Sequence, residues 1–399
     1  MNKTAIKLQQ LAECAQNGVN KNKELCLFSE HDFANGKPER SYNQPESLLH
    51  LPFVNSSTKL RAICESLNIN HNVDNGFCLT QSELNLIHQY SQKIVSNQRP
   101  TNTETAIWCI SQQKGGSGKT TLSTTAAVGM ATEFLGEYRI AFIDLDPQAT
   151  GTLYLKPNFD DSNISVGDLL NRNFELEEGE TYEEVCKKAF YPTNTPNLFV
   201  LGAREEDRYY ETFVEERRQE ANKKGEHYVS YGDLQVILDA VKDEFDIIFI
   251  DTTPYFSAAT NAGHFVANNL LIPVRPSEND FDGGAKHLSH LALQYGLYAN
   301  EGHKGYENII LQPMAVENNN AHVDMIHRIR ITYTDNCSPY NFVESKAVTH
   351  CASAYCTIYD LSRSEYDLGS KASLKRAQDE TRSVLRYIEQ RTLAFWGQA

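Results

Sequence analysis

Residues 106–131 read AIWCISQQKGGSGKTTLSTTAAVGMA, an apolar run followed by a glycine-rich loop and a helical pattern. A strand, such a loop and a helix N-terminus together bind nucleotide phosphates, because the glycines let backbone N–H groups approach the anion and the helix dipole favours negative charge. We expect Lys119 to reach the β- and γ-phosphates and Thr120 to hold Mg²⁺. The full set of expected phosphate-binding residues is Lys114, Gly115, Gly116, Ser117, Gly118, Lys119, Thr120 and Thr121.

The loop departs from the usual phosphate-binding pattern in one respect. That pattern has a glycine at the position of Gln113, whereas here a second lysine, Lys114, opens the loop. The form Lys-Gly-Gly-x-Gly-Lys-Thr matches the deviant Walker A motif, in which the extra lysine crosses a dimer interface to the partner's nucleotide. The alternative is a glycine-rich turn with two solvated lysines, which the surrounding strand and helix patterns disfavour.

Length and composition indicate a cytoplasmic protein of two or three domains. The chain has 399 residues, of which 40% are apolar, and no run approaches the ~20 apolar residues of a membrane span. Its polar N-terminus does not suggest export, and its nine cysteines without paired spacing favour reduced thiols over a metal site. The net charge of -15 argues against nucleic-acid binding, but only weakly where a binding surface is local.

The first hundred residues differ from the rest of the chain. Apolar residues fall on one helical face of 5–16, which predicts a helix there. Residues 1–45 are expected to form an N-terminal helical or dimerisation segment. The pattern of 24–53 is not periodic and leaves its structure open. Residues 96–105 read as a linker.

Residues 46–100 suggest a winged helix-turn-helix. A helix capped by Ser56 or Ser57 precedes an Asn-Gly hairpin signal over 72–79, and a second helix opens at the capping box 80–83. Lys59 and Arg61 would then lie on the recognition helix and contact DNA. A small helical bundle without a DNA role explains the same pattern equally well.

From residue 106 to 399 apolar runs alternate with helical patterns, which predicts a doubly wound, mostly parallel α/β domain. The expected strands are 106–110, 139–145, 197–201, 246–251, 269–274 and 308–312. An exposed helix is expected over 205–224, and a terminal amphipathic helix is expected over 370–397.

Two of these strands end in carboxylates, at the sheet edge where open α/β folds bind ligands. Asp144 and Asp146 follow the second strand; Asp146 is expected to position or deprotonate the attacking water, and Asp144 to hold Mg²⁺ through its shell. Asp251 ends the fourth strand as a Walker B aspartate, facing a Mg²⁺-bound water beside Thr120. Solvated strand-end aspartates are the alternative, which the Asp-Pro-Gln context disfavours.

These three motifs resemble the ParA/MinD family of deviant Walker A ATPases, over residues 106 to about 395. The sequence Asp-Leu-Asp-Pro-Gln at 144–148 is most similar to the ParA branch, and the N-terminal extension resembles the large, type Ia partition ATPases, which repress their own operon. The resemblance implies ATP with Mg²⁺, with adenine near Pro273 and Pro276 and Asp280 following. Thr253 stands where the family has a proline.

The resemblance also implies a mechanism with Lys114, Lys119 and Asp146 as catalytic residues. ATP would close a homodimer in which each Lys114 contacts the partner's phosphates, and the dimer, or a filament of dimers, would bind DNA nonspecifically on the nucleoid. A ParB-type centromere-binding protein would stimulate hydrolysis during plasmid partition or chromosome segregation. Candidate DNA contacts in this half are Arg328, Arg330, Lys375 and Arg376, each of which is alternatively part of a solvated face.

Two other functions remain open from the sequence. One is a repressor whose nucleotide site senses without turnover. The other is a MinD-like membrane ATPase, for which 392–396 would have to belong to a membrane-binding helix. The ParA resemblance predicts no membrane partner.

Overall fold

The computed structural model describes residues 3–26, 36–73, 76–92 and 99–398. Part of the expected linker and the turn of the expected hairpin lie outside the described residues. Among the described helices, none combines the length and the apolar character that a membrane crossing requires.

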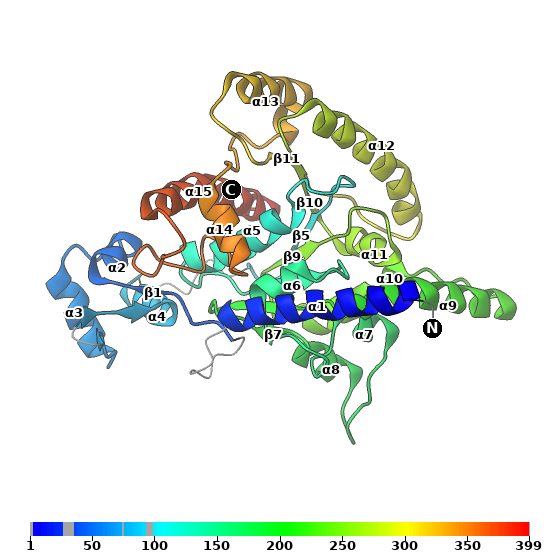
Figure 1. Cartoon of the computed structure of the whole chain (residues 1–399), viewed down its shortest axis with the longest axis horizontal. Coiled ribbons are helices and arrows are strands. Elements are labelled where there is room, and N and C mark those ends of the chain that lie inside the picture. The colour runs from blue at the N-terminus through cyan, green and yellow to red at the C-terminus, as the bar shows by residue number, and fades with distance from the viewer. Residues whose placement is uncertain (1–2, 27–35, 74–75, 93–98, 399) are drawn as a thin grey trace.

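A seven-stranded sheet forms the centre of the molecule, with the strand order β11-β10-β5-β9-β6-β8-β7 (Figure 1). All pairings are parallel except that of β7 with β8. The doubly wound fold expected from the sequence is therefore confirmed, and the six expected runs are its six parallel strands. The strands are β5 (Ala106–Ile110), β6 (Ile140–Asp144), β7 (Tyr191–Pro192), β8 (Leu198–Leu201), β9 (Ile247–Asp251), β10 (Asn269–Val274) and β11 (Asn308–Pro313).

Helices cover both faces of the sheet because side chains alternate between the faces along each strand. In β6, Phe142 joins a core with α5 (Lys119–Glu133), α14 (Lys346–Ser353) and α15 (Lys371–Phe395). Its neighbour Ile143 joins the opposite core, formed with α7 (Val166–Asn171), α8 (Tyr182–Lys188), α9 (Tyr210–Lys224), α10 (Tyr231–Val241) and α11 (Ala258–Val266). Strands buried on both faces explain why the runs are apolar throughout.

The remaining helices connect or flank the strands. They are α6 (Thr150–Leu155), α12 (Glu278–Asn300) and α13 (Asn320–Tyr333), with short 3-10 helices at Glu205–Tyr209 and Thr334–Asn336. The helix expected over 205–224 begins as one of these 3-10 turns before α9. It is mostly exposed, but Tyr210 and Val214 are buried and attach it to the core.

The N-terminal region has a small core of its own. Its elements are α1 (Lys3–Cys26), β1 (Ser41–Tyr42), α2 (Gln44–His50), α3 (Ser57–Ser66), β2 (Asn72–Val73), β3 (Gly76–Phe77), β4 (Leu79–Thr80) and α4 (Gln81–Gln92). The expected helix, hairpin and helix are all present, and the backbone N–H of Thr80 and the carboxylate of Glu83 form the expected capping box at 2.8 Å. Strand β1 pairs with β4, so residues 41–42 belong to the unit formed by α2, α3 and α4.

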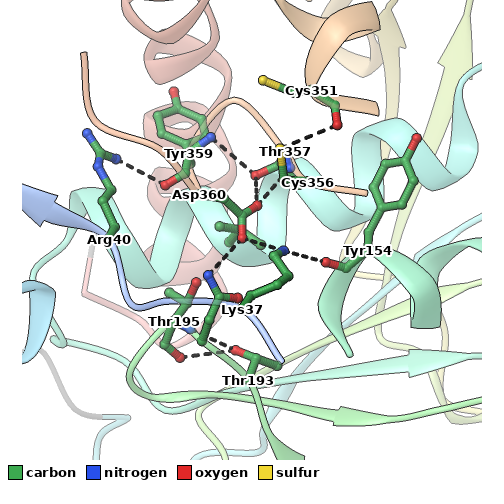
Figure 2. A network of polar contacts seen from close by, with 12 residues as sticks. Lys37, Arg40, Tyr154, Thr193, Thr195, Cys351, Cys356, Thr357, Tyr359 and Asp360 are labelled. Atoms are coloured by element: carbon green, nitrogen blue, oxygen red, sulfur yellow. Dashed lines mark hydrogen bonds and ion pairs between the residues drawn. The ribbon is translucent and has the colours of Figure 1, made fainter. Parts of the chain in front are cut away.

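The segment before β1 is embedded in the α/β domain (Figure 2). The Lys37 ammonium lies 2.7 Å from a carboxylate oxygen of Asp360 and donates to the carbonyl of Tyr154, at the end of α6, at 2.8 Å. Arg40 donates to the carbonyl of Tyr359 at 3.1 Å. The two regions are therefore joined by a buried ion pair as well as by the chain.

Candidate nucleotide-binding site

The three motifs meet at the carboxyl ends of three adjacent strands. Ile110, which precedes the glycine-rich loop, is in register with Asp251, and Asp251 is in register with Asp144 on its other side. Parallel strands bring their carboxyl ends to one edge of a sheet, which is where ligands bind in this class of fold. The structure thus brings together the loop and all three predicted carboxylates.

The glycine-rich loop has the shape of an anion cradle. Gly116 and Gly118 have φ values of 73° and 96°, in the left-handed region that favours glycine. A side chain added at Gly115 or Gly116 would meet nothing within 4 Å, so this part of the loop is open. Helix α5 begins at Lys119 without a side-chain cap, which leaves its first N–H groups available to phosphate oxygens.

Lys119 lies inside the loop, as expected of a phosphate-binding lysine. Only 7% of its surface is exposed, and its ammonium donates to the carbonyl of Gln112 at 3.0 Å. Burial lowers the pKa of Lys119, whereas the charges of Asp251 and Asp146 act to raise it. A bound polyphosphate would supply the negative charge that favours the ammonium form.

Thr120 and Asp251 form the arrangement expected around Mg²⁺. The Thr120 hydroxyl donates to Asp251 Oδ2 at 2.6 Å. Among the described residues, Asp251 Oδ1 is buried without a hydrogen-bond donor, since the nearby Ser123 hydroxyl donates to the Thr120 carbonyl. The Ser117 hydroxyl is likewise buried and unpartnered. An oxygen-rich site with a free carboxylate oxygen fits a hydrated Mg²⁺ ion.

Asp144 and Asp251 lie side by side, fully buried, at the carboxyl ends of β6 and β9. Burial, and for Asp144 also the neighbouring Asp251, raises the pKa of both carboxyl groups. Asp144 accepts hydrogen bonds from the backbone and hydroxyl of Thr152, both at 2.8 Å, and from the backbone of Asp146 at 3.1 Å. Both Asp144 oxygens are engaged, so Asp144 positions α6 and the turn that carries Asp146.

Asp146 extends from this turn toward the site. It is partly exposed, and its charge acts on the pKa of both Lys119 and Asp251. One of its oxygens accepts from the backbone of Gln148 at 3.0 Å. Asp146 therefore lies beside the phosphate loop with a carboxylate that solvent can reach, as a residue acting on water requires.

Lys114 makes a contact that the sequence did not predict. Its ammonium lies 2.5 Å from a carboxylate oxygen of Asp280, at the start of α12; the two side chains are 36% and 7% exposed. Pro273 and Pro276, the expected adenine contacts, are buried beside the same region, and the carbonyl of Pro273 accepts from the side chain of Gln112 at 3.3 Å.

A buried serine and two histidines, which the sequence pattern did not predict, contact one another where β5 leads into the loop. Ser111 Oγ lies 2.8 Å from His264 Nε2 and 3.4 Å from His287 Nε2. Burial lowers the pKa of His264 to about 3 and that of His287 to about 4, so both rings are neutral at pH 7. No local sequence signal could have found this cluster, because it joins α11 and α12 to the residue after β5 across more than 150 residues.

Thr253, at the position where the sequence departs from the Asp-Ser/Thr-Pro-Pro pattern, makes two hydrogen bonds through its hydroxyl. Its hydroxyl lies 2.8 Å from that of Thr260 and donates to the carbonyl of Tyr255 at 2.7 Å. These bonds fix the loop after β9 by polar contacts.

The four candidate DNA-binding residues of the α/β domain lie in different settings. Arg328 pairs with Glu278 at 2.6 Å, and Arg330 donates to the loop around Asn341 at 2.8 Å. On α15, Lys375 lies 3.6 Å from Asp379 and Arg376 2.9 Å from Glu380. The side chains of Lys375 and Arg376 are 54% and 69% exposed, so these two adjacent cations are the more accessible pair.

The two N-terminal candidates lie on α3. Lys59 is exposed and donates to the carbonyl of Phe53 at 2.9 Å. The Arg61 guanidinium lies 6.0 Å from the ring centre of Phe77 in the hairpin that follows. Both cations therefore lie on a helix that a β-hairpin follows, and the winged helix-turn-helix stays a prediction.

Comparison with known proteins agrees with this geometry. Residues 105–295 match a family model described as an AAA domain. Plasmid partition protein A of Escherichia coli is 26% identical over 227 residues, 55% of this chain and 54% of that protein. The virulence plasmid ParA family protein pGP5-D of Chlamydia psittaci is 24% identical over 163 residues, 41% of this chain and 54% of that protein. The chain thus spans about half the length of these curated relatives.

Two solved structures share the fold at low sequence identity. A structure described as a partition protein has a TM-score of 0.65 at 19% identity and covers 96% of this chain and 98% of its own. Cobyrinic acid a,c-diamide synthase from Mycobacterium smegmatis, with a bound ATP analogue and magnesium, has a TM-score of 0.50 at 18% identity, covering 71% of this chain and 96% of its own. The fold therefore accommodates ATP-type ligands and Mg²⁺.

The parallel sheet, the glycine-rich loop and the carboxylates at its edge define a P-loop NTPase fold. The matched domain and the named relatives show that this part of the chain is similar to plasmid partition proteins and ParA family proteins.

Proposed function

We propose that the protein is a cytoplasmic, nucleoid-associated partition ATPase of ParA type that hydrolyses ATP with Mg²⁺. The observation that carries the proposal is the contact of Thr120 with Asp251 at 2.6 Å, beside a loop that presents two lysines. The names of the relatives support a role in plasmid partition.

Each residue of the nucleotide site has a distinct role in ATP hydrolysis. Lys119 and the backbone N–H groups at the start of α5 bind the phosphates, and Thr120 and Asp251 hold Mg²⁺. A Mg²⁺ ion held by these two residues would offset negative charge on the transferring phosphoryl group. Asp146 orients the attacking water or accepts its proton, and Pro273 and Pro276 flank the adenine.

ATP closes a homodimer in which Lys114 of each subunit contacts the partner's phosphates, with the role that an arginine finger has in other NTPases. The closed dimer, alone or in filaments, binds DNA nonspecifically through Lys375 and Arg376, and a ParB-type protein stimulates hydrolysis. The unit of α3 and the following hairpin binds an operator through Lys59 and Arg61 and represses the protein's own operon.

The proposal is tested by ATPase assays with and without random duplex DNA. We expect slow basal hydrolysis that DNA and a cognate ParB-type protein accelerate. Asp146→Ala is expected to bind ATP within about twofold of wild type but to lower kcat about 100-fold, since it removes water activation and no phosphate contact. Wild-type turnover in this variant would refute the role of Asp146, and absence of turnover under all conditions would favour a nucleotide-sensing repressor.

A further inference from the structure

One face of α12 lies along the residues that lead into the phosphate loop. His290 Nδ1 lies 2.8 Å from the side-chain oxygen of Gln113, and His287 Nε2 lies 3.4 Å from Ser111 Oγ. Positions 280, 283, 284, 287 and 290 recur every three or four residues and so fall on one side of the helix. The first half of the helix therefore contacts the segment 111–114.

The first turns of this face hold Lys114. A Cβ added at Gly283 would lie 3.6 Å from Cδ of Lys114, so the lysine stem runs close to the helix backbone. Its ammonium ends 2.5 Å from Asp280, whose carboxylate also accepts from the Ser277 hydroxyl at 2.5 Å. Because the side chain of Asp280 is 7% exposed, this contact is shielded from water more than an ordinary surface ion pair.

We propose that Asp280 is a positioning residue that holds Lys114 within its own subunit and thereby sets the ATP concentration at which two subunits close. The inference rests on the proposed function, in which Lys114 contacts the partner's nucleotide. One ammonium cannot lie against Asp280 and across a dimer interface at the same time. Closure therefore exchanges the carboxylate of Asp280 for phosphate oxygens of the partner's ATP, and the strength of the first contact opposes the second.

The contact itself is testable without nucleotide. In Asp280→Asn the side chain keeps its size and an acceptor for Ser277, but loses the charge that holds Lys114. Acylation of the full-length protein by an N-hydroxysuccinimide ester, read by mass spectrometry, is expected to modify Lys114 roughly fivefold faster in this variant, the factor for about 1 kcal/mol. Asp282→Asn is the matched control, because it removes an exposed charge from the same helix. Equal acylation of Lys114 in wild type and Asp280→Asn would overturn the proposal.

The consequence for closure is measured by sedimentation with Mg²⁺ and a slowly hydrolysed ATP analogue. Asp280→Asn is expected to form dimers at a roughly fivefold lower analogue concentration than wild type, and Asp282→Asn at the wild-type concentration. In a Lys114→Ala background, Asp280→Asn is expected to have no further effect, because the two residues act as one pair. Dimerisation of Asp280→Asn that is unchanged or weakened would overturn the role of Asp280.

This experiment distinguishes failure of the proposed function from failure of the role of Asp280. Failure of the wild-type protein to bind the analogue would refute the proposed function and with it the nucleotide threshold, while acylation would still show whether Asp280 restrains Lys114. Wild-type binding and dimerisation combined with no response to Asp280→Asn would refute only the inference drawn from α12.

Discussion

The ion pair between Lys37 and Asp360 allows a quantitative test of how the N-terminal region is joined to the α/β domain. Their side chains are 8% and 2% exposed, and they lie 323 residues apart in the chain. Lys37→Met replaces the ammonium by an apolar group of similar length. Asp360 would then remain buried with its charge opposed by hydrogen bonds alone.

The expected loss of stability follows from this burial. Removing one partner of a buried pair costs about 3–5 kcal/mol, because it leaves an uncompensated charge. Asp360 keeps hydrogen bonds from Asn194 at 3.0 Å and from the backbone and hydroxyl of Thr357 at 2.7 and 2.8 Å, which favours the lower end, about 3 kcal/mol. An unfolding entropy of about 2.1 cal/mol/K per residue then gives a fall in Tm of about 4 °C for the 399-residue chain.

Thermal unfolding of the nucleotide-free protein measures this change. Lys304→Met is the control, because Lys304 pairs with Glu104 in solvent with both side chains mostly exposed, and we expect it to leave Tm unchanged. The double variant Lys37→Met/Asp360→Asn is expected to be less destabilised than the sum of the two single variants, since neither charge is left alone. Additive losses, or a Tm for Lys37→Met equal to that of wild type, would refute the buried pair.

The pH dependence provides an independent check with a definite sign. Burial raises the pKa of Asp360, but Lys37 and the hydrogen bonds outweigh it and hold the pKa below its usual value. A depressed carboxyl pKa contributes stability that is present above the unfolded pKa of about 3.9 and is lost as pH falls through the folded value. The difference in Tm between wild type and Lys37→Met is therefore expected to be large at pH 7 and to shrink as pH falls below about 4.

Three further predictions concern the nucleotide and DNA sites. Lys119→Ala should abolish ATP binding in equilibrium dialysis, whereas Lys114→Ala should bind ATP but dimerise more weakly on sedimentation; equal loss of binding would refute the cross-dimer role. Burial raises the pKa of Asp251, so the folded state binds more protons than the unfolded state and loses stability as pH rises from about 4 to neutral. Asp251→Asn should therefore gain Tm relative to wild type over that range while losing Mg²⁺-dependent ATP binding, and a parallel pH profile would contradict this. Lys375→Ala and Arg376→Ala should each weaken ATP-dependent binding to every DNA sequence and lower the salt slope by about 0.9, with ATP binding intact; unchanged slopes would exclude that surface.

The sequence alone determined the frame of the nucleotide site. Each parallel strand is a continuous apolar run because it is buried on both faces. Such a run can be recognised in the sequence without knowing which strands lie beside it. The loop from Lys114 to Thr121 is equally local, since glycines and a helix N-terminus within eight residues suffice to cradle phosphate. The rule that strand ends meet at one edge then placed Asp146 and Asp251 beside it.

Only the tertiary structure decided which distant groups restrain that site. The pairing of Lys114 with Asp280, the histidines behind Ser111 and the ion pair of Lys37 with Asp360 join residues more than 150 positions apart. Such contacts depend on how whole helices pack on the sheet, and an isolated aspartate or histidine carries no trace of its partner in the local pattern. For the same reason, the sequence identifies the lysines and arginines of the chain, but only the structure shows which of them form salt bridges and which are exposed to solvent.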